Sequence, residues 1–308
     1  MSGAFCAAVD WGTSSFRLWL LDASGAPLAE RRSDQGMSGL TGGGFGTVLE
    51  SHLAALSAPA DLPVVVCGMA GARQGWIEAP YVDTPAALDR VADHCVRPEH
   101  AAREVRILPG VAQRDPAAPD VMRGEETQLL GAFAGQDGAG LACMPGTHSK
   151  WVRLSGTRID GFSTVMTGEM FAALGHHTIL SHSLAEPEGE AAAAAFAAAV
   201  RRALARPEAL VSEFFRIRAG GLLGFAAPGT GGGTLSGLLI GAEIAAARAL
   251  AGLPEEVTLI ASGAIAERYG TALALAGCTT RRIDADGAAR AGLFAAATRL
   301  WPTRNRRD

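Results

Sequence analysis

The sequence lacks the cysteine pattern by which several classes of protein are recognised. Its 308 residues include only five cysteines, and none of them forms a Cys-x-x-Cys pair. They are Cys6, Cys67, Cys95, Cys143 and Cys278. This odd and scattered set argues against a disulfide framework, a zinc finger and an iron–sulfur ligand set.

The sequence also has little excess charge. The formal net charge is −4, so the basic surface typical of a nucleic-acid binder is missing. Arg304, Arg306 and Arg307 form a short basic end, which we interpret as a solvated tail.

Long apolar segments are missing as well. No signal peptide is recognised before the first expected strand, and no apolar run reaches the roughly 18 residues that span a bilayer. We therefore expect a cytoplasmic protein without a membrane or nucleic-acid partner. A homodimer is left open.

What is present is a globular composition, with 48% hydrophobic and 19% charged residues. The length suits one large domain or two lobes. In the first half, alternation and turn residues predict the order β-β-β-α-β-α-β. The expected strands are residues 4–10, 16–22, 27–32, 63–67 and 105–108. One helix follows a loop at 42–46 and ends near residue 56, and another covers 88–96.

The second half begins with the same pattern, because a strand–turn–strand–turn–strand opening occurs near residue 4 and again near residue 141. Strands are expected over 141–144, 150–154, 157–163, 257–261 and 281–283. Helices are expected over 125–134, 167–176, 188–205, 207–219, 235–251, 265–276 and 287–300. The repeat predicts an α/β fold of two related lobes, residues 1–113 and 114–308.

The first hairpin, residues 10–17, has the chemistry of a phosphate site. Gly12 lets the backbone approach a ligand, and Thr13 and Ser14 add hydroxyls next to turn N–H groups. Asp10 is placed to hold Mg²⁺ directly or through water. Arg17 is a candidate to pair with an anionic substrate. The alternative is an ordinary hairpin with an aspartate at its turn.

The second hairpin, residues 145–150, repeats this chemistry. Gly146 and Thr147 supply the turn, and Lys150 can reach a phosphate as a point charge. His148 is a candidate contact too, although a hydrogen bond within its own turn is the simpler interpretation. Two such hairpins, one from each lobe, predict that the phosphates of one nucleotide are held from both sides.

Two acids precede this hairpin at the start of a helix. Glu125 and Glu126 interact favourably with a helix dipole there, but either is also a candidate base for a substrate hydroxyl. Asp115 and Asp120 are rivals in the preceding loop. The choice between these carboxylates stays open.

The loop over residues 68–76 cannot be a nucleophile elbow, because Ala70 occupies the position of the serine. Arg73 is a candidate to bind a substrate carboxylate, with Trp76 beside it. The alternative is a surface loop on which Trp76 packs. Thr167 and Glu169 begin a helix and are candidate substrate contacts, with a helix cap as the alternative.

Other segments are less informative. The glycine-rich segment 229–233 lacks the Gly-Lys-Ser/Thr ending of a P-loop and is interpreted as a flexible junction. His176, His177 and His182 lack the spacing of a metal site. Ser262, Gly263 and Ala264 follow a predicted strand, where small residues let an adenosine lie against the backbone.

Together these segments resemble the superfamily of actin, sugar kinases and heat-shock ATPases. The chain resembles the 2-dehydro-3-deoxygalactonokinase family more closely. The segments that carry this closer resemblance are Val9–Thr13, Pro145–Trp151, Met166–Glu169 and Leu239–Ile244.

The resemblance implies two ribonuclease-H-like lobes with a cleft between them that binds ATP and Mg²⁺. The implied activity is phosphorylation of 2-dehydro-3-deoxy-D-galactonate to its 6-phosphate. Many sugar kinases of the superfamily use an aspartate as base where this chain has Gly124-Glu125-Glu126. The rivals are an ATPase or phosphatase of the same fold, a kinase for another sugar or sugar acid, a sugar-sensing regulator without catalytic activity, and an activator ATPase for an iron–sulfur protein.

Overall fold

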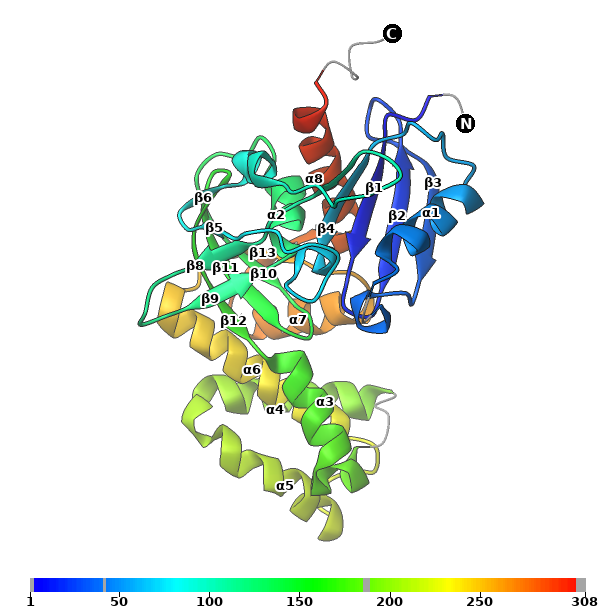
Figure 1. The fold of residues 1–308 in the computed structure, drawn as a ribbon. Coiled ribbons are helices and arrows are strands. Elements are labelled where there is room, and N and C mark those ends of the chain that lie inside the picture. Colours follow the sequence, from blue (N-terminus) through cyan, green and yellow to red (C-terminus); the bar gives the residue numbers. More distant parts are fainter. Residues whose placement is uncertain (1–2, 41–42, 185–188, 303–308) are drawn as a thin grey trace. The chain divides into compact units, whose positions relative to one another are not determined.

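The computed structural model describes residues 3–40, 43–184 and 189–302, which form two compact units (Figure 1). Unit 1 comprises Met1–Ala139, Leu154–Gly161 and Asp284–Asp308, and unit 2 comprises Gly140–Arg153 and Phe162–Ile283. Three sequence-based predictions lie wholly or partly outside the described residues. They are the start of the loop at 42–46, the start of the helix at 188, and the basic tail at 304–307.

Unit 1 is built on a five-stranded sheet of order β3-β2-β1-β4-β7. Its strands are β1 (Cys6–Trp11), β2 (Phe16–Leu21), β3 (Pro27–Ser33), β4 (Val64–Gly68) and β7 (Val105–Ile107). The first three strands are antiparallel neighbours, whereas β4 pairs parallel with both β1 and β7. All six residues of β1 are buried, as expected for a central strand covered on both faces.

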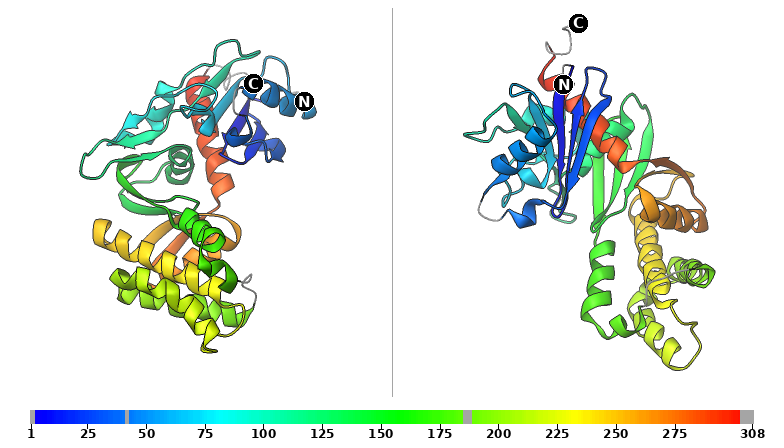
Figure 2. Two further views of the ribbon diagram at one scale, coloured as in Figure 1. Left: turned by 60° about the horizontal axis from the view of Figure 1, so that its bottom comes forward. Right: turned by 90° about the vertical axis from the view of Figure 1, so that its right-hand side faces the viewer.

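Helices cover both faces of this sheet. Helix α1 (Phe45–Ala55) packs with Val9, Trp11 and Val66 on one face. Helix α8 (Ala285–Leu300) packs with Cys6, Ala8 and Trp19 on the other; Figure 2 shows it in red against the blue strands.

Unit 1 also contains α2 (Glu125–Phe133), which lies against α8. Its remaining elements are short strands and 3₁₀ helices. They are η1 (Met37–Gly39), η2 (Met69–Gly71), η3 (Leu88–His94), β5 (Val82–Asp83), β6 (Ala86–Ala87), β8 (Val111–Gln113) and β9 (Asp120–Met122). Strands β5, β8 and β9 form a small sheet of their own.

Unit 2 contains a sheet in which β14-β13-β10-β11-β12 are hydrogen-bonded in that order. Its strands are β10 (Ala139–Met144), β11 (Ser149–Ser155), β12 (Arg158–Val165), β13 (Glu256–Ile260) and β14 (Thr279–Ile283). Strand β13 pairs parallel with β10 and β14. The end of β11 and the start of β12, within Leu154–Gly161, belong to unit 1. There, Arg158 and Ile159 of β12 pair with β6.

Helices make up the rest of unit 2. They are α3 (Thr167–His177), η4 (Ile179–Ser183), α4 (Glu190–Ala205), η5 (Pro207–Ala209), α5 (Leu210–Leu222), α6 (Gly231–Ala251) and α7 (Gly263–Leu275). Two apolar clusters hold them, one containing Phe196, Ile240 and Tyr269 beneath the sheet, and one containing Leu180 and Leu235 among the helices.

The predicted fold class is confirmed. In both units a run of three consecutive strands is followed by two parallel strands added beside the first, which is the order expected of a ribonuclease-H-like lobe. The units differ in extent from the lobes predicted to meet at residues 113 and 114. The chain returns to unit 1 at Asp284 because α8 packs on α2 and on β1.

Three local predictions were wrong. Residues 88–94 form a 3₁₀ helix and not an α-helix. The short strands β5, β6, β8 and β9 were missed, because two or three residues give no alternation to detect. The segment Gly229–Gly233 is not a flexible junction, since Gly231–Gly233 are buried and form the first turn of α6.

The expectation that no apolar run could span a membrane also needs correction. By length and composition alone, α6 is long and apolar enough to cross a membrane. However, 56% of its most apolar 18-residue stretch is buried inside the protein, as in the core helix of a folded domain. It is the one helix among the described residues with these properties.

The glycines of α6 allow it to touch the backbone of α4. A Cβ added at Gly233, Gly237 or Gly241 would lie 2.6, 2.4 or 2.8 Å from a carbonyl oxygen of α4. Those oxygens belong to Ala192, Phe196 and Val200, so both helices contribute every fourth residue to the contact. Small residues at this spacing let two helices pack unusually closely, and this explains glycines that would otherwise weaken a helix.

Substitution of Gly237 by Ala should therefore destabilise unit 2. The added methyl group has to displace the α4 backbone, and overpacking of this kind costs about 1–3 kcal/mol. The free energy of unfolding is measured by urea denaturation. Gly221→Ala in α5 is the matched control, because a Cβ there meets nothing within 4 Å. Equal stability of the two variants would show that the helices are not in backbone contact.

Candidate active site

The first hairpin turn connects β1 to β2 and is closed by its own backbone. The N–H of Gly12 donates to the carbonyl of Ser15 at 2.8 Å. A Cβ at Gly12 would lie 2.8 Å from Ser15 Oγ and 3.3 Å from Ser15 O, so the turn leaves little room for a side chain there. Thr13 and Ser14 are exposed. The turn thus presents hydroxyl and N–H groups to solvent, which suits phosphate oxygens.

A neighbouring segment of unit 1 packs on this turn. The N–H groups of Met37 and Ser38 donate to the carbonyls of Gly12 and Thr13 at 3.0 and 2.9 Å. Gly36 is buried, and a Cβ there would lie 2.4 Å from Thr13 O. This segment therefore fixes the conformation of the first hairpin turn.

The second hairpin turn connects β10 to β11 in unit 2. Gly146, Thr147 and His148 are exposed, whereas Lys150 is only 4% exposed. Lys150 Nζ donates to the carbonyl of His148 at 3.2 Å. His148 Nε2 lies 2.5 Å from Glu169 Oε2, so the histidine pairs with α3 and not with its own turn.

The start of α3 packs on the second turn as residues 36–38 pack on the first. The N–H of Glu169 donates to Thr147 O at 3.0 Å. A Cβ at Gly168 would lie 2.5 Å from Gly146 O and 2.8 Å from Thr147 Cα. In each unit, then, a threonine carbonyl accepts a backbone N–H, and an adjacent glycine touches the turn.

Asp10 lies at the end of β1 in an electrostatically crowded place. It is 8% exposed, and its Oδ2 is 3.2 Å from Arg17 Nη2. Burial raises the pKa of Asp10; Arg17 opposes this rise, while Asp286 and Glu125 add to it. The thiol of Cys67 hydrogen-bonds the same carboxyl group.

The structure gives Arg17 two partners within the protein. Its guanidinium pairs with Asp10 and, from α8, with Asp286. Asp286 also pairs with Arg32 at 2.7 Å. The predicted contact of Arg17 with a substrate stays a prediction, and its observed role is to join β2 to the carboxylates on either side.

Glu125 and Glu126 begin α2, as predicted. Glu126 is 1% exposed; its Oε2 accepts the N–H of Gly124 at 2.8 Å and its Oε1 accepts the hydroxyl of Thr127 at 3.0 Å. Burial, followed by repulsion from Glu125, raises the pKa of Glu126 to about 7. Glu125 is less buried and accepts the N–H of Arg123 at 3.0 Å. Both acids thus also satisfy N–H groups around the helix start, which is the simpler role considered for them.

The loop after β4 separates the two residues predicted there. Arg73 is exposed, and its guanidinium makes no hydrogen bond or ion pair with the described part of the chain. Trp76 stacks on Phe45 and lies edge-on to Trp11, with ring centroids 6.2 and 6.4 Å apart. Trp76 therefore packs against the protein, which is the alternative that we considered to a substrate contact.

Arg123, which the sequence analysis missed, lies under this loop. It donates to Ala79 O at 2.9 Å and its guanidinium carbon lies 4.4 Å from the Tyr81 ring centroid. A Cβ at Gly71 would be 2.9 Å from its Nη1. Arg123 therefore ties the loop to the start of α2.

Thr167 and Glu169, the other predicted substrate contacts, both have protein partners. Thr167 is 6% exposed and donates its hydroxyl to Glu243. Glu169 pairs with His148 and does not cap α3, whose N-cap is Met166 without a side-chain hydrogen bond. Substrate contact by either residue stays a prediction.

Ser262, Gly263 and Ala264 form the exposed start of α7. Gly263 has a φ of 62°, and a Cβ there would meet nothing within 4 Å. There is thus open space beside Gly263, which suits the predicted adenosine contact, and the contact itself stays a prediction.

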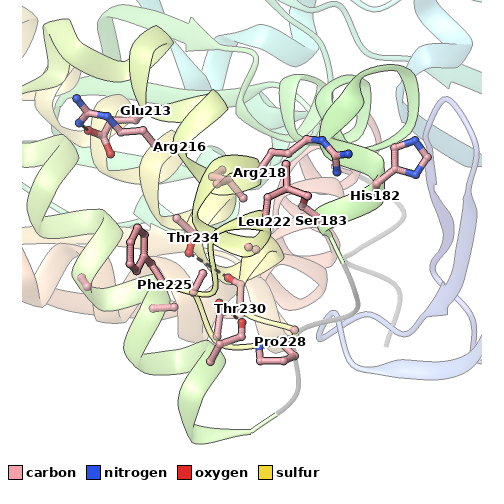
Figure 3. A pocket seen from close by; sticks show the side chains of 18 of the residues that line it. His182, Ser183, Glu213, Arg216, Arg218, Leu222, Phe225, Pro228, Thr230 and Thr234 are labelled. Carbon is pink, nitrogen blue, oxygen red and sulfur yellow. Dashed lines mark hydrogen bonds and ion pairs between the residues drawn. The ribbon is translucent and has the colours of Figure 1, made fainter.

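A cavity of about 670 Å³ lies among the helices of unit 2 (Figure 3). Arg218 and His182 border one part of it, and Glu213 with its partner Arg216 borders another. Thr230, in the glycine-rich segment 229–233, lines it too. None of the predicted catalytic or phosphate-binding residues does so. Among the described residues no cluster of three or more His, Cys, Asp or Glu side chains forms a metal site.

Comparisons with known proteins cover nearly the whole chain. A family profile described as 2-keto-3-deoxy-galactonokinase matches residues 10–296. "Probable 2-dehydro-3-deoxygalactonokinase DgoK1" of Rhizobium meliloti is 55% identical over 98% of this chain and 99% of its own. The 2-dehydro-3-deoxygalactonokinase of Escherichia coli is 36% identical over 93% of this chain and 95% of its own.

A solved structure is similar throughout. The structure described as "Crystal structure of a putative 2-dehydro-3-deoxygalactonokinase protein from Sinorhizobium meliloti" is 55% identical to this chain, with a TM-score of 0.92. The match covers 96% of this chain and 99% of that one.

Replacement of Glu126 by Gln should change how stability depends on pH. The pKa is about 7 in the folded protein, against a usual value of 4.5. As pH rises between these values the unfolded chain ionises first, so the free energy of unfolding falls, by on the order of 3 kcal/mol in all. Glu126→Gln should abolish this fall. Urea denaturation at about pH 4.5 and pH 8 measures it.

Glu267→Gln is the control for this experiment, since the side chain of Glu267 is 71% exposed. It should retain the pH dependence of the wild type. If Glu126→Gln retained that dependence as well, the acid would not be protonated within the fold.

Proposed function

Because the chain belongs to the 2-keto-3-deoxy-galactonokinase family, we propose that it transfers the γ-phosphoryl group of ATP to 2-dehydro-3-deoxy-D-galactonate. The transfer forms the 6-phosphate of this sugar acid. The observation that carries the proposal is the identity of 55% and 36% to relatives with that name over almost the full length of each chain.

Phosphoryl transfer depends on positioning and charge neutralisation more than on covalent help from the protein. The two hairpin turns supply positioning, because each presents exposed N–H and hydroxyl groups in a conformation fixed by a second segment. We assign binding of phosphate groups to each of these turns, and binding of the adenosine to the exposed start of α7 at Ser262–Ala264.

The carboxyl group of Asp10 fits a role in holding Mg²⁺. This ion keeps several waters and usually takes only one or two protein carboxylates besides substrate phosphates, so no larger cluster of ligands is needed. When bound, the ion would neutralise phosphate charge. Arg17 and Cys67 orient the Asp10 carboxyl group through the contacts described above.

Two further roles concern the sugar acid. Glu125 is the more accessible of the two acids at the start of α2. We therefore assign it the role of general base, which accepts the proton of the attacking hydroxyl. Glu126 holds the start of α2 in place through its hydrogen bonds with Gly124 and Thr127. Arg73 is the better candidate for the substrate carboxylate, because Arg17 already pairs with two carboxylates.

The reaction is tested by measuring ADP release from the purified protein with ATP, Mg²⁺ and a panel of sugar acids. We expect ADP to form with 2-dehydro-3-deoxy-D-galactonate and the 6-phosphate to be identified by ³¹P NMR. The 4-epimer, D-galactonate and a reaction without acceptor are the comparisons. ADP formed without an acceptor would indicate an ATPase, and preference for another acid would change the substrate.

Two substitutions test the assigned roles. Asp10→Asn and Glu125→Gln should each lower kcat by about 100-fold or more while the circular dichroism spectrum is retained. Asp89→Asn is the control, because the Asp89 side chain is 59% exposed on a surface turn. Full activity of either site variant would remove that residue from the mechanism.

We also propose that the chain forms a homodimer through α5. This helix and the residues after it expose Val211, Phe215, Leu222, Leu223 and Phe225, each by 64% or more. Phe215 and Phe225 can each bury ~150–250 Å², so this set can supply a substantial part of the ~800 Å² that one partner contributes to a stable interface. A second copy is a suitable partner because a two-fold contact uses the same patch on both copies, and bulky side chains of one helix can pack on the small Ala219–Gly221 segment of the other.

Sedimentation velocity tests this proposal. The wild type should sediment as a dimer and Phe215→Glu as a monomer. Leu250→Glu should remain dimeric, because Leu250 is equally exposed but lies at the far end of α6. A monomeric wild type, or a dimeric Phe215→Glu variant, would contradict it.

A further inference from the structure

Three of the segments that carried the family resemblance meet at one buried carboxyl group. Glu243 of α6 is 2% exposed. Its Oε1 accepts the indole N–H of Trp151 in β11 at 2.8 Å. Its Oε2 accepts the hydroxyl of Thr167, at the start of α3, and that of Tyr269 in α7 at 2.6 Å. Tyr269 in turn hydrogen-bonds Ser149 at 3.0 Å.

A carboxyl group in this place is costly unless it is hydrogen-bonded. Leu239 and Ile244 of the same helix are buried in apolar clusters. Burial raises the pKa of Glu243, and the hydrogen bonds from Thr167, Tyr269 and Trp151 oppose this rise. The donors are neutral, so they satisfy the carboxyl oxygens without forming an ion pair.

The donors lie on both sides of the second hairpin turn. Ser149 and Trp151 flank Lys150, where β11 leaves the turn. Thr167 precedes Gly168 and Glu169, whose backbone contacts fix Gly146 and Thr147 from the other side. One side chain from α6 thus connects β11, α3 and α7 around the residues to which we assign phosphate.

We propose that Glu243 is a positioning residue for ATP: it holds the second hairpin turn and the start of α3 in register so that their N–H groups meet the phosphates. This proposal rests on the proposed function. Glu243 does not itself reach the nucleotide and acts through Trp151 and Thr167. A shift of the turn by about 1 Å is enough to weaken transfer strongly.

Glu243→Gln keeps the size of the side chain but replaces one acceptor oxygen with a donor. Trp151 can only donate, so the remaining oxygen serves it and the contact to Thr167 is rearranged. We expect the KM for ATP to rise by about tenfold, while the KM for the sugar acid stays within about twofold. Glu243→Asp, which retains two acceptor oxygens on a shorter side chain, should recover part of the affinity.

Glu213→Gln is the matched control, because Glu213 is also a buried acid of unit 2. It is 6% exposed, but its partners are Arg202 and Arg216, far along the chain from the second hairpin. It should reduce the melting temperature without changing the KM for ATP. An unchanged KM for ATP in Glu243→Gln, or an equal rise in Glu213→Gln, would overturn the proposal.

Thr167→Val provides a second route in case Glu243→Gln fails to fold. It removes one donor and should raise the KM for ATP in the same direction. Binding of ATP without a sugar acid, measured by calorimetry, separates this proposal from the proposed function. If the wild type binds ATP but phosphorylates none of the sugar acids, Glu243 is still tested by the loss of ATP binding in its variants.

Discussion

Direct contact between helix backbones is the constraint on which both units depend. In unit 1, a Cβ at Gly292 of α8 would lie 1.8 Å from Thr127 O of α2, and a Cβ at Gly131 would lie 2.1 Å from Ala288 O. In unit 2, α6 touches α4 in the same manner. The helices held this closely are those that carry Glu126, Asp286 and Glu243. Protein interiors are densely packed and deform little. The glycines at these helix contacts therefore help to set the distances between the three acids and their partners.

Asp10, beside the first hairpin turn, and Glu243, behind the second, have partners of different charge. In unit 1, Asp10 and Asp286 share the guanidinium of Arg17, and Glu126 receives a backbone N–H and a hydroxyl. In unit 2, Glu243 has only neutral donors. A charge balanced by a cation can be redistributed when an anion or a metal ion arrives, whereas a charge satisfied by neutral dipoles fixes geometry. This difference suits the binding of a metal ion or an anion near the first hairpin turn. It also suits a fixed, non-catalytic position for Glu243 behind the second hairpin turn.

Much of the fold could be predicted, because alternation and turn residues are local signals. The two hairpins, the sheet order they imply and most helices followed from them. Segment 229–233 was misjudged because glycine weakens a helix locally, and only contact with Ala192 and its neighbours explains it. The hydrogen-bond and ion-pair partners of the site residues could not be predicted from the sequence either. Asp286 lies 269 residues from Arg17, and Glu243 lies 92 residues from Trp151, and nothing in either local sequence indicates the pairing.

The path of the chain has a consequence for biosynthesis. Unit 1 starts at the amino terminus but includes α8, which begins at Ala285, whereas unit 2 is contained within residues 140–283. Domains emerging from the ribosome ordinarily fold in the order of their synthesis. Here the apolar face that α8 covers, around Cys6 and Trp19, stays open until the residues of α8 have been synthesised. The unit made first is thus the one completed last, and a nascent chain stalled before Ala285 would expose a sheet face to chaperones.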